Sequence, residues 1–94
     1  MIQSLLSNEK KCLVCGCERD IHRHHIFYGT ANRKNSERDG CWCFLCGMHH
    51  NLSSAGVHFN RELDLKIKRE CQKKWEETYG DRDAFIRRFG KSYL

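Results

Sequence analysis

The sequence predicts a small α+β domain stapled by a bound metal ion, with its strands in the first half and its main helices in the second. The chain has 94 residues, enough for one domain, and a chain of this size buries only roughly 60–65% of its unfolded surface. Seven cysteines and six histidines occur together, a mixture that favours metal binding over a disulfide framework. Short apolar runs precede residue 46, whereas apolar residues at helical spacing begin only after residue 60.

The two expected strands flank a polar stretch. Residues 1–11 form a polar lead-in, and residues 12–17 form a tight turn that carries thiols. Residues 21–28 favour a strand because they are rich in β-branched and aromatic side chains. Residues 29–40 are polar and basic without alternation, so we expect a solvated basic loop. Residues 41–45 are short and apolar, which is typical of a strand buried on both faces.

Helices are expected from the paired histidines onward. A short helix follows the second strand and ends at Gly56. A longer helix has Asn60 as its N-cap and stops at Gly80. Its apolar stripe recurs every four residues: Leu63, Ile67, Cys71, Trp75 and Tyr79. Asp81 caps a last helix, which Gly90 closes.

Two pairs of candidate ligands have the spacing of a structural zinc site. Cys12 and Cys15 form one pair, and Cys46 and His49 form the other. Tight turns can bring ligands three residues apart to the same side, so three thiolates and one imidazole can hold Zn2+. A second arrangement uses Cys43 instead of His49, but residues three apart on a strand point to opposite faces. A third alternative is a chain that binds no metal.

Adjacent histidines occur at two places. His24 and His25 end the first strand, and His49 and His50 begin the short helix. Successive strand residues point to opposite sides, so His24 and His25 can have different roles. His22 is expected to lie on the face that meets the substrate or elsewhere at the surface, rather than to be a ligand.

The order Cys-x2-Cys, then His-His-Ile, then Leu-Cys-x2-His-His resembles the HNH endonucleases, whose fold is the ββα-metal finger. The resemblance covers residues 12 to about 60, and most of the chain is similar to small phage-encoded HNH proteins of the recombination-enhancement, RecA-dependent nuclease type. It implies a single domain over residues 1–94, with a zinc-stapled ββα core at about 12–58 and a helical C-terminal part at about 60–90. The implied activity is metal-dependent hydrolysis of DNA phosphodiester bonds.

The resemblance also implies roles for the histidines. His25 matches the general base, and His24 and His50 match ligands of a catalytic divalent ion, expected to be Mg2+ or Mn2+. His-rich sites also accept Zn2+ or Ni2+.

Two positions depart from the family pattern. The last ligand position falls on Ser54, a poor ligand. His58 is the next candidate if the chain folds back, with Asn51 and a water as alternatives. The middle Asn of the family, which orients the general base, falls near Cys41. Asp39 is a neighbour, and Asn32 and Asn35 lie further upstream. The group that orients the base therefore stays open.

The charge balance favours a polyanionic partner. Seventeen Lys and Arg against 12 Asp and Glu give a net charge of +5. The expected phosphate contacts on DNA are Arg23, Arg33, Lys34 and Arg38, and a second basic cluster contains Arg87, Arg88 and Lys91. No segment resembles a base-reading helix, so we expect little sequence specificity. Specificity would then come from a RecA-type filament, another phage protein, a DNA structure or self-association.

Other settings and functions remain to be weighed. No apolar run approaches 18 residues, so no membrane span is expected. The apolar stretch within residues 1–11 is too short for a secretory signal. We therefore expect a cytoplasmic protein of a bacterial or phage-infected cell. The alternative function is a non-catalytic zinc module that binds nucleic acid or a protein of a DNA-packaging machine. A zinc-stabilised dimer with no role on DNA is the third hypothesis.

Overall fold

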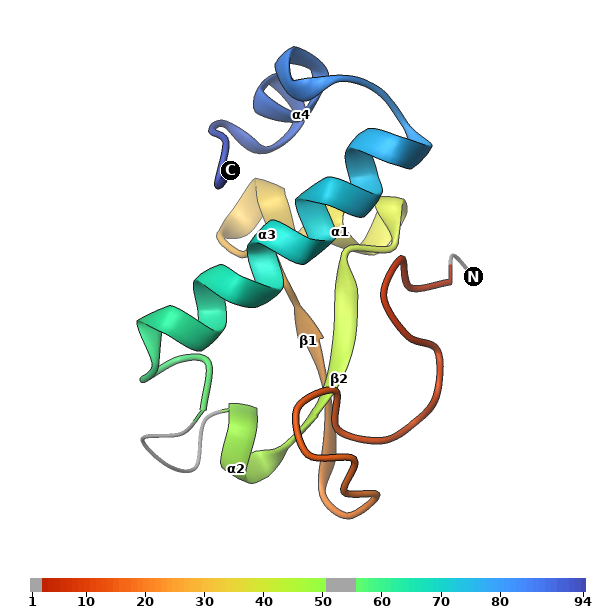
Figure 1. The fold of residues 1–94 in the computed structure, drawn as a ribbon, viewed down its shortest axis with the longest axis vertical. Coiled ribbons are helices and arrows are strands. Elements are labelled where there is room, and N and C mark those ends of the chain that lie inside the picture. The colour runs from red at the N-terminus through yellow and green to blue at the C-terminus, as the bar shows by residue number, and fades with distance from the viewer. Residues whose placement is uncertain (1–2, 51–55) are drawn as a thin grey trace.

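Two short antiparallel strands run through the middle of the molecule (Figure 1). In this computed structural model, which describes residues 3–50 and 56–94, β1 (Ile21–His25) pairs with β2 (Trp42–Cys46). The one-turn helix α2 (Gly47–His50) follows β2 directly. Together with three longer helices, the sheet makes a small, compact α+β fold with a radius of gyration of 12.7 Å.

The predicted strands are present with adjusted bounds. The first ends at His25 rather than at residue 28, and the two residues that follow it, Ile26 and Phe27, are fully buried. The second begins one residue later than expected and includes Cys46. The antiparallel register sets Cys46 opposite Ile21, and it sets Trp42 opposite His25. The end of β2 that leads into α2 is therefore the end where β1 begins.

The predicted loop over residues 29–40 is wrong, because most of this stretch forms helix α1 (Thr30–Asp39). Gly29 and Gly40, with φ values of 102° and 78°, bound it at the two ends. The buried side of α1 is polar. Ser36 is fully buried, and its hydroxyl donates to the Phe27 carbonyl at 2.7 Å. Apolar periodicity cannot detect a helix that packs through hydrogen bonds.

The two C-terminal helices agree with the sequence prediction. Helix α3 (Arg61–Thr78) begins after Asn60, whose side chain accepts a hydrogen bond from the Leu63 amide at 3.1 Å. Helix α4 (Arg82–Phe89) begins after Asp81, which accepts from the Ala84 amide at 2.8 Å. In Figure 1, α3 crosses in front of the strands, and α4 and α2 lie at opposite ends of the long axis. None of the described helices is long and apolar enough to cross a membrane.

The core joins the sheet to the C-terminal helices. The Phe27 ring lies 5.1 Å from the Phe85 ring and 4.6 Å from the Phe89 ring, measured between centroids. Helix α1 is bound to the same region by hydrogen bonds, since Asn32 and Asn35 donate to carbonyls of Phe89 and Arg88, both at 3.0 Å. Helix α4 therefore holds α1 against the core.

Asp39, at the end of α1, is the most heavily bonded of these anchors. It is buried, and its carboxylate accepts from Trp75 Nε1 at 2.9 Å and from Arg88 at 2.8 and 2.9 Å. The Tyr79 hydroxyl donates to its carbonyl at 2.9 Å. This network fixes the C-terminal end of α1.

Candidate metal and catalytic centre

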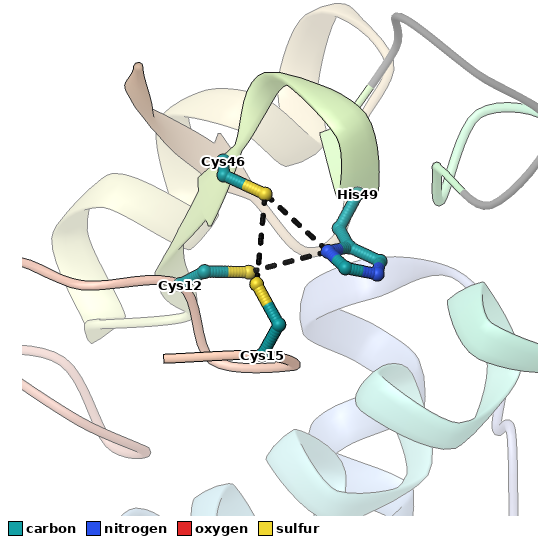
Figure 2. A group of neighbouring side chains, drawn as sticks. All are labelled: Cys12, Cys15, Cys46 and His49. Carbon is teal, nitrogen blue, oxygen red and sulfur yellow. Dashed lines mark hydrogen bonds between the residues drawn. The ribbon is translucent and has the colours of Figure 1, made fainter. Parts of the chain in front are cut away.

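Four side chains with metal-binding atoms converge where β2 meets α2 (Figure 2). Cys46 is the last residue of β2, and His49 lies in α2. Cys12 and Cys15 come from the N-terminal segment, which is held against β2 by a hydrogen bond from the Leu13 amide to the Phe44 carbonyl at 2.8 Å. The four candidate ligand atoms all lie within 4.8 Å of one another.

The distances in this cluster suit a tetrahedral metal ion. The sulfur of Cys46 lies 3.3 Å from Nδ1 of His49, and the sulfur of Cys12 lies 3.7 Å from the same nitrogen. The sulfurs of Cys15 and Cys46 are 3.8 Å apart. A tetrahedron with Zn–S bonds of about 2.3 Å and Zn–N bonds of about 2.0 Å has edges of roughly 3.5–3.8 Å. The group can therefore hold a metal ion.

The protonation of Cys12 favours the same role. Burial raises the pKa of its thiol, but backbone hydrogen bonds from Cys46, Cys15 and Val14 outweigh burial and lower the pKa to about 6. A thiolate is the form that binds metal. Cys43, the ligand of the four-thiolate alternative, lies instead in the core, where burial raises the pKa of its thiol to about 12.

Three histidines form a second cluster beside the first. His24 from β1, His50 from α2 and His58 from the following segment bring their ring nitrogens within 4.8 Å of one another. Nε2 of His58 lies 3.2 Å from Nε2 of His50. His49 and His50 are neighbours in sequence, so one short helix contributes a ligand to each cluster.

His58 reaches this cluster because the chain folds back against α2. The Val57 amide donates to the His49 carbonyl at 2.9 Å, and the His58 amide donates to the His50 carbonyl at 3.3 Å. The sequence predicts His58 as a ligand only if the chain folds back after the short helix, and these two hydrogen bonds show that it does. The alternatives Ser54 and Asn51, and the end of the short helix, fall outside the described residues.

The environment of His24 keeps its imidazole neutral. His24 is buried, and burial together with the nearby His50 and His58 lowers its pKa to about 3. Burial, with His58 and His22, also lowers the pKa of His50. A neutral imidazole has the free lone pair that metal binding requires.

His22, expected at the surface, contacts the ring of His50. Its Nδ1 is 2.8 Å from Nδ1 of His50, and its Nε2 is 3.0 Å from the carboxylate of Asp20. Metal-binding imidazoles commonly donate their second N–H to such a partner. Asp20 and His22 were missed because the sequence gives no sign that β1 begins against α2.

His25 is not a member of the three-histidine cluster, and its side chain contacts α1. Its Nε2 lies 2.9 Å from Oε2 of Glu37, and the other carboxylate oxygen of Glu37 lies 2.8 Å from Arg23. The Arg23 guanidinium also stacks on the Trp42 ring at 3.9 Å. Arg23, predicted to contact phosphate, is thus engaged inside the protein. Glu37 was missed because its stretch was expected to be a loop.

Two adjacent surface pockets, which share four lining residues, contain these groups. One is lined by Arg23, His24, His25, Tyr28, Gly29, Thr30, Arg33, His50 and His58. The other, which shares Arg23, His25, Thr30 and Arg33 with the first, adds Lys34, Glu37 and Arg38 from α1. Within the described part of the chain, Arg33, Lys34 and Arg38 form no ion pair. The two pockets therefore carry three available cations beside the histidines.

The second basic cluster of the sequence is in part structural. Arg88 is bound to Asp39, and this contact raises the pKa of its guanidinium. Arg87 is exposed, and the Lys91 ammonium lies 5.0 Å from the Tyr93 ring.

Comparison with known proteins adds no relative to this description. No family model matches the chain, and neither a curated protein nor a solved structure matches it.

Proposed function

We propose that this protein is a metal-dependent endonuclease of the HNH type that hydrolyses DNA phosphodiester bonds on a ββα-metal core. One observation carries the proposal: three candidate metal ligands, His24, His50 and His58, line a pocket together with His25 and Arg33. The adjacent pocket adds the other basic side chains of α1, Lys34 and Arg38. Hydrolysis of a phosphodiester needs these parts together, namely a base, a cation and groups that bind phosphate.

The cysteine cluster would hold a structural Zn2+. Three sulfurs and one imidazole are the donors of a closed zinc site, and the site ties the N-terminal segment to the junction of β2 and α2. Because His49 is one of its ligands, the ion would also fix the start of the helix from which His50 projects. The first site therefore organises the second.

The three-histidine cluster would hold the catalytic divalent ion. Such an ion supplies charge neutralisation for the attacked phosphate and the leaving oxygen. Three imidazoles favour Zn2+, Ni2+ or Co2+, whereas Mg2+ and Mn2+ prefer oxygen donors. The expected Mg2+ or Mn2+ would need oxygen ligands from water and phosphate to complete its shell.

His25 is the candidate general base. It lines the pocket beside the three histidines without belonging to their cluster, so its imidazole is available to take a proton from an attacking water. Arg33, Lys34 and Arg38 lie along one side of α1 and would bind the phosphates that flank the cleaved bond. Because these cations are few, DNA binding should weaken only moderately as salt is raised. Contacts to phosphates do not read base edges, so we expect little sequence preference.

The test is cleavage of supercoiled plasmid and of single-stranded DNA by the wild type and by His25→Ala. Each protein is assayed with Mg2+, Mn2+, Zn2+, Ni2+ and Co2+, after its retained zinc has been measured. We expect the wild type to cut and the variant to lose about 10²–10⁴-fold in rate at equal zinc content, because it lacks the base.

Two other results would contradict the proposal. Equal cleavage by both proteins would remove His25 from the mechanism. DNA binding without cleavage, with and without a RecA-type filament, would support the non-catalytic zinc module instead.

A further inference from the structure

We infer that Glu37 is the positioning residue for His25: it holds the imidazole with its proton on Nε2, which leaves Nδ1 free to accept a proton from water. This inference rests on the proposed function and names the group that takes the place of the family's middle Asn. Neither Asn32 nor Asn35 has this role, since both donate to α4, and Asp39 is occupied by Trp75 and Arg88.

The contact between the two side chains assigns the tautomer. Oε2 of Glu37 lies 2.9 Å from Nε2 of His25. A carboxylate only accepts hydrogen bonds, so the imidazole nitrogen that faces it must carry the proton. In a neutral imidazole the other nitrogen, Nδ1, is then the acceptor, and general-base catalysis needs that lone pair.

Glu37 is itself held on two sides. Arg23 lies 2.8 Å from its second oxygen, and the Arg23 guanidinium is stacked on Trp42 at 3.9 Å. Trp42 is the residue opposite His25 in the strand register. Helix α1, which carries Glu37, is anchored to α4 because the Asn32 side chain donates to the Phe89 carbonyl. The carboxylate is thus fixed relative to β1 by both a cation and a helix.

The presence of Arg23 makes Glu37→Gln an informative variant. Arg23 has only donors, so the glutamine would turn its carbonyl oxygen toward Arg23 and its NH2 group toward His25. Nε2 of His25 could then only accept a hydrogen bond, so the proton of the neutral imidazole would move to Nδ1. With Nδ1 protonated, the imidazole has no free lone pair on that side to take a proton from water. In Glu37→Ala no group imposes either tautomer, so this variant should keep more activity than Glu37→Gln.

The kinetic test compares these two variants with the wild type. We expect Glu37→Gln to lower the turnover rate by about 10²–10⁴-fold, as expected when an orienting carboxylate is replaced by its amide. Its DNA affinity should be unchanged or tighter because a negative charge is lost. Glu77→Gln, an equal change of charge on an exposed side chain of α3, is the matched control and should behave as the wild type.

The second test reads the tautomer directly by 15N NMR of the zinc-loaded protein. We expect the His25 proton on Nε2 in the wild type and on Nδ1 in Glu37→Gln. A wild type with the proton on Nδ1, or a Glu37→Gln variant with wild-type turnover, would overturn the inference. The tautomer can be read whether or not the protein cuts DNA, so failure of the proposed function and failure of this inference are distinguishable.

Discussion

Asp20, His22 and His50 form a chain of side chains that ends at the three-histidine cluster. Asp20 can only accept from His22 Nε2, so His22 Nδ1 is left to accept from Nδ1 of His50. This order of donors leaves Nε2 of His50 free to bind a metal. Asp20 adopts a φ of 51°, in the left-handed region that Asp and Asn enter more often than most residues other than glycine.

We predict that His22→Phe weakens divalent ion binding at the three-histidine cluster by about 10–100-fold, because the ring of His50 loses the partner that orients it. The measurement is a Co2+ titration of protein already loaded with one zinc. His25→Ala, which changes a histidine outside the cluster, should bind Co2+ as the wild type does. If His22→Phe bound Co2+ as tightly as the wild type, the hydrogen bonds from Asp20 through His22 would have no effect on His50 as a metal ligand.

At the scale of single residues, the side chains that the sequence grouped as candidate ligands lie close together. Turns of fixed length explain why Cys12 lies beside Cys15 and Cys46 beside His49, but they do not bring together the three histidines, which come from separate parts of the chain. The sequence could not predict the contact between His25 and Glu37. That contact depends on the helical state of α1 and on its rotation, which local sequence does not specify.

Among the elements, α1 connects the C-terminal helices to the pocket. One side carries Asn32, Asn35, Ser36 and Asp39 toward the protein, and the other carries the pocket residues Arg33, Lys34, Glu37 and Arg38. Hydrophobic patterning predicted α3 and α4, whose caps and apolar stripes are regular. It missed α1 because polar side chains cover both of its sides.

We predict that Asp39→Asn destabilises the protein by about 2–4 kcal/mol, because the amide replaces one of the two acceptor oxygens that bind Trp75 and Arg88 with a donor and removes the charge that pairs with Arg88. Thermal unfolding should shift down by at least about 8 °C for a domain of this size. Asp83→Asn, an isosteric change at an exposed position of α4, is the control and should stay within about 0.5 kcal/mol of the wild type. A shift no larger than that of the control would mean that α1 does not depend on this anchor.

For the whole molecule, the cysteine cluster joins parts of the chain that the core joins weakly. The N-terminal segment has few buried apolar side chains. Its backbone is tied to Gly40, at the end of α1, by the Leu5 amide and to β2 by the Leu13 amide. A domain of fewer than 100 residues has a marginal core, so a metal ion should contribute strongly to its folding free energy.

We predict that removing zinc with a strong chelator unfolds the protein or lowers its unfolding temperature sharply, and that Cys15→Ser has the same effect. Cys17→Ser is the matched control, since Cys17 is a nearby thiol outside the cluster. Circular dichroism and bound-zinc measurements follow both variants. Unchanged melting of the chelated protein would contradict a structural role for the ion.

The dependence of α1 on α4 also sets an order for events during synthesis. The acceptors of Asn32 and Asn35 are carbonyls of Phe89 and Arg88, which the ribosome adds 57 and 53 residues after these two asparagines. Until the ribosome has released that stretch, α1 lacks these contacts, and Glu37 lacks the support that keeps it against His25. The ligand clusters, whose last described member is His58, can form earlier. A nascent chain would thus acquire its metal sites before its base is in position, and the proposed nuclease activity would follow metal binding rather than accompany it.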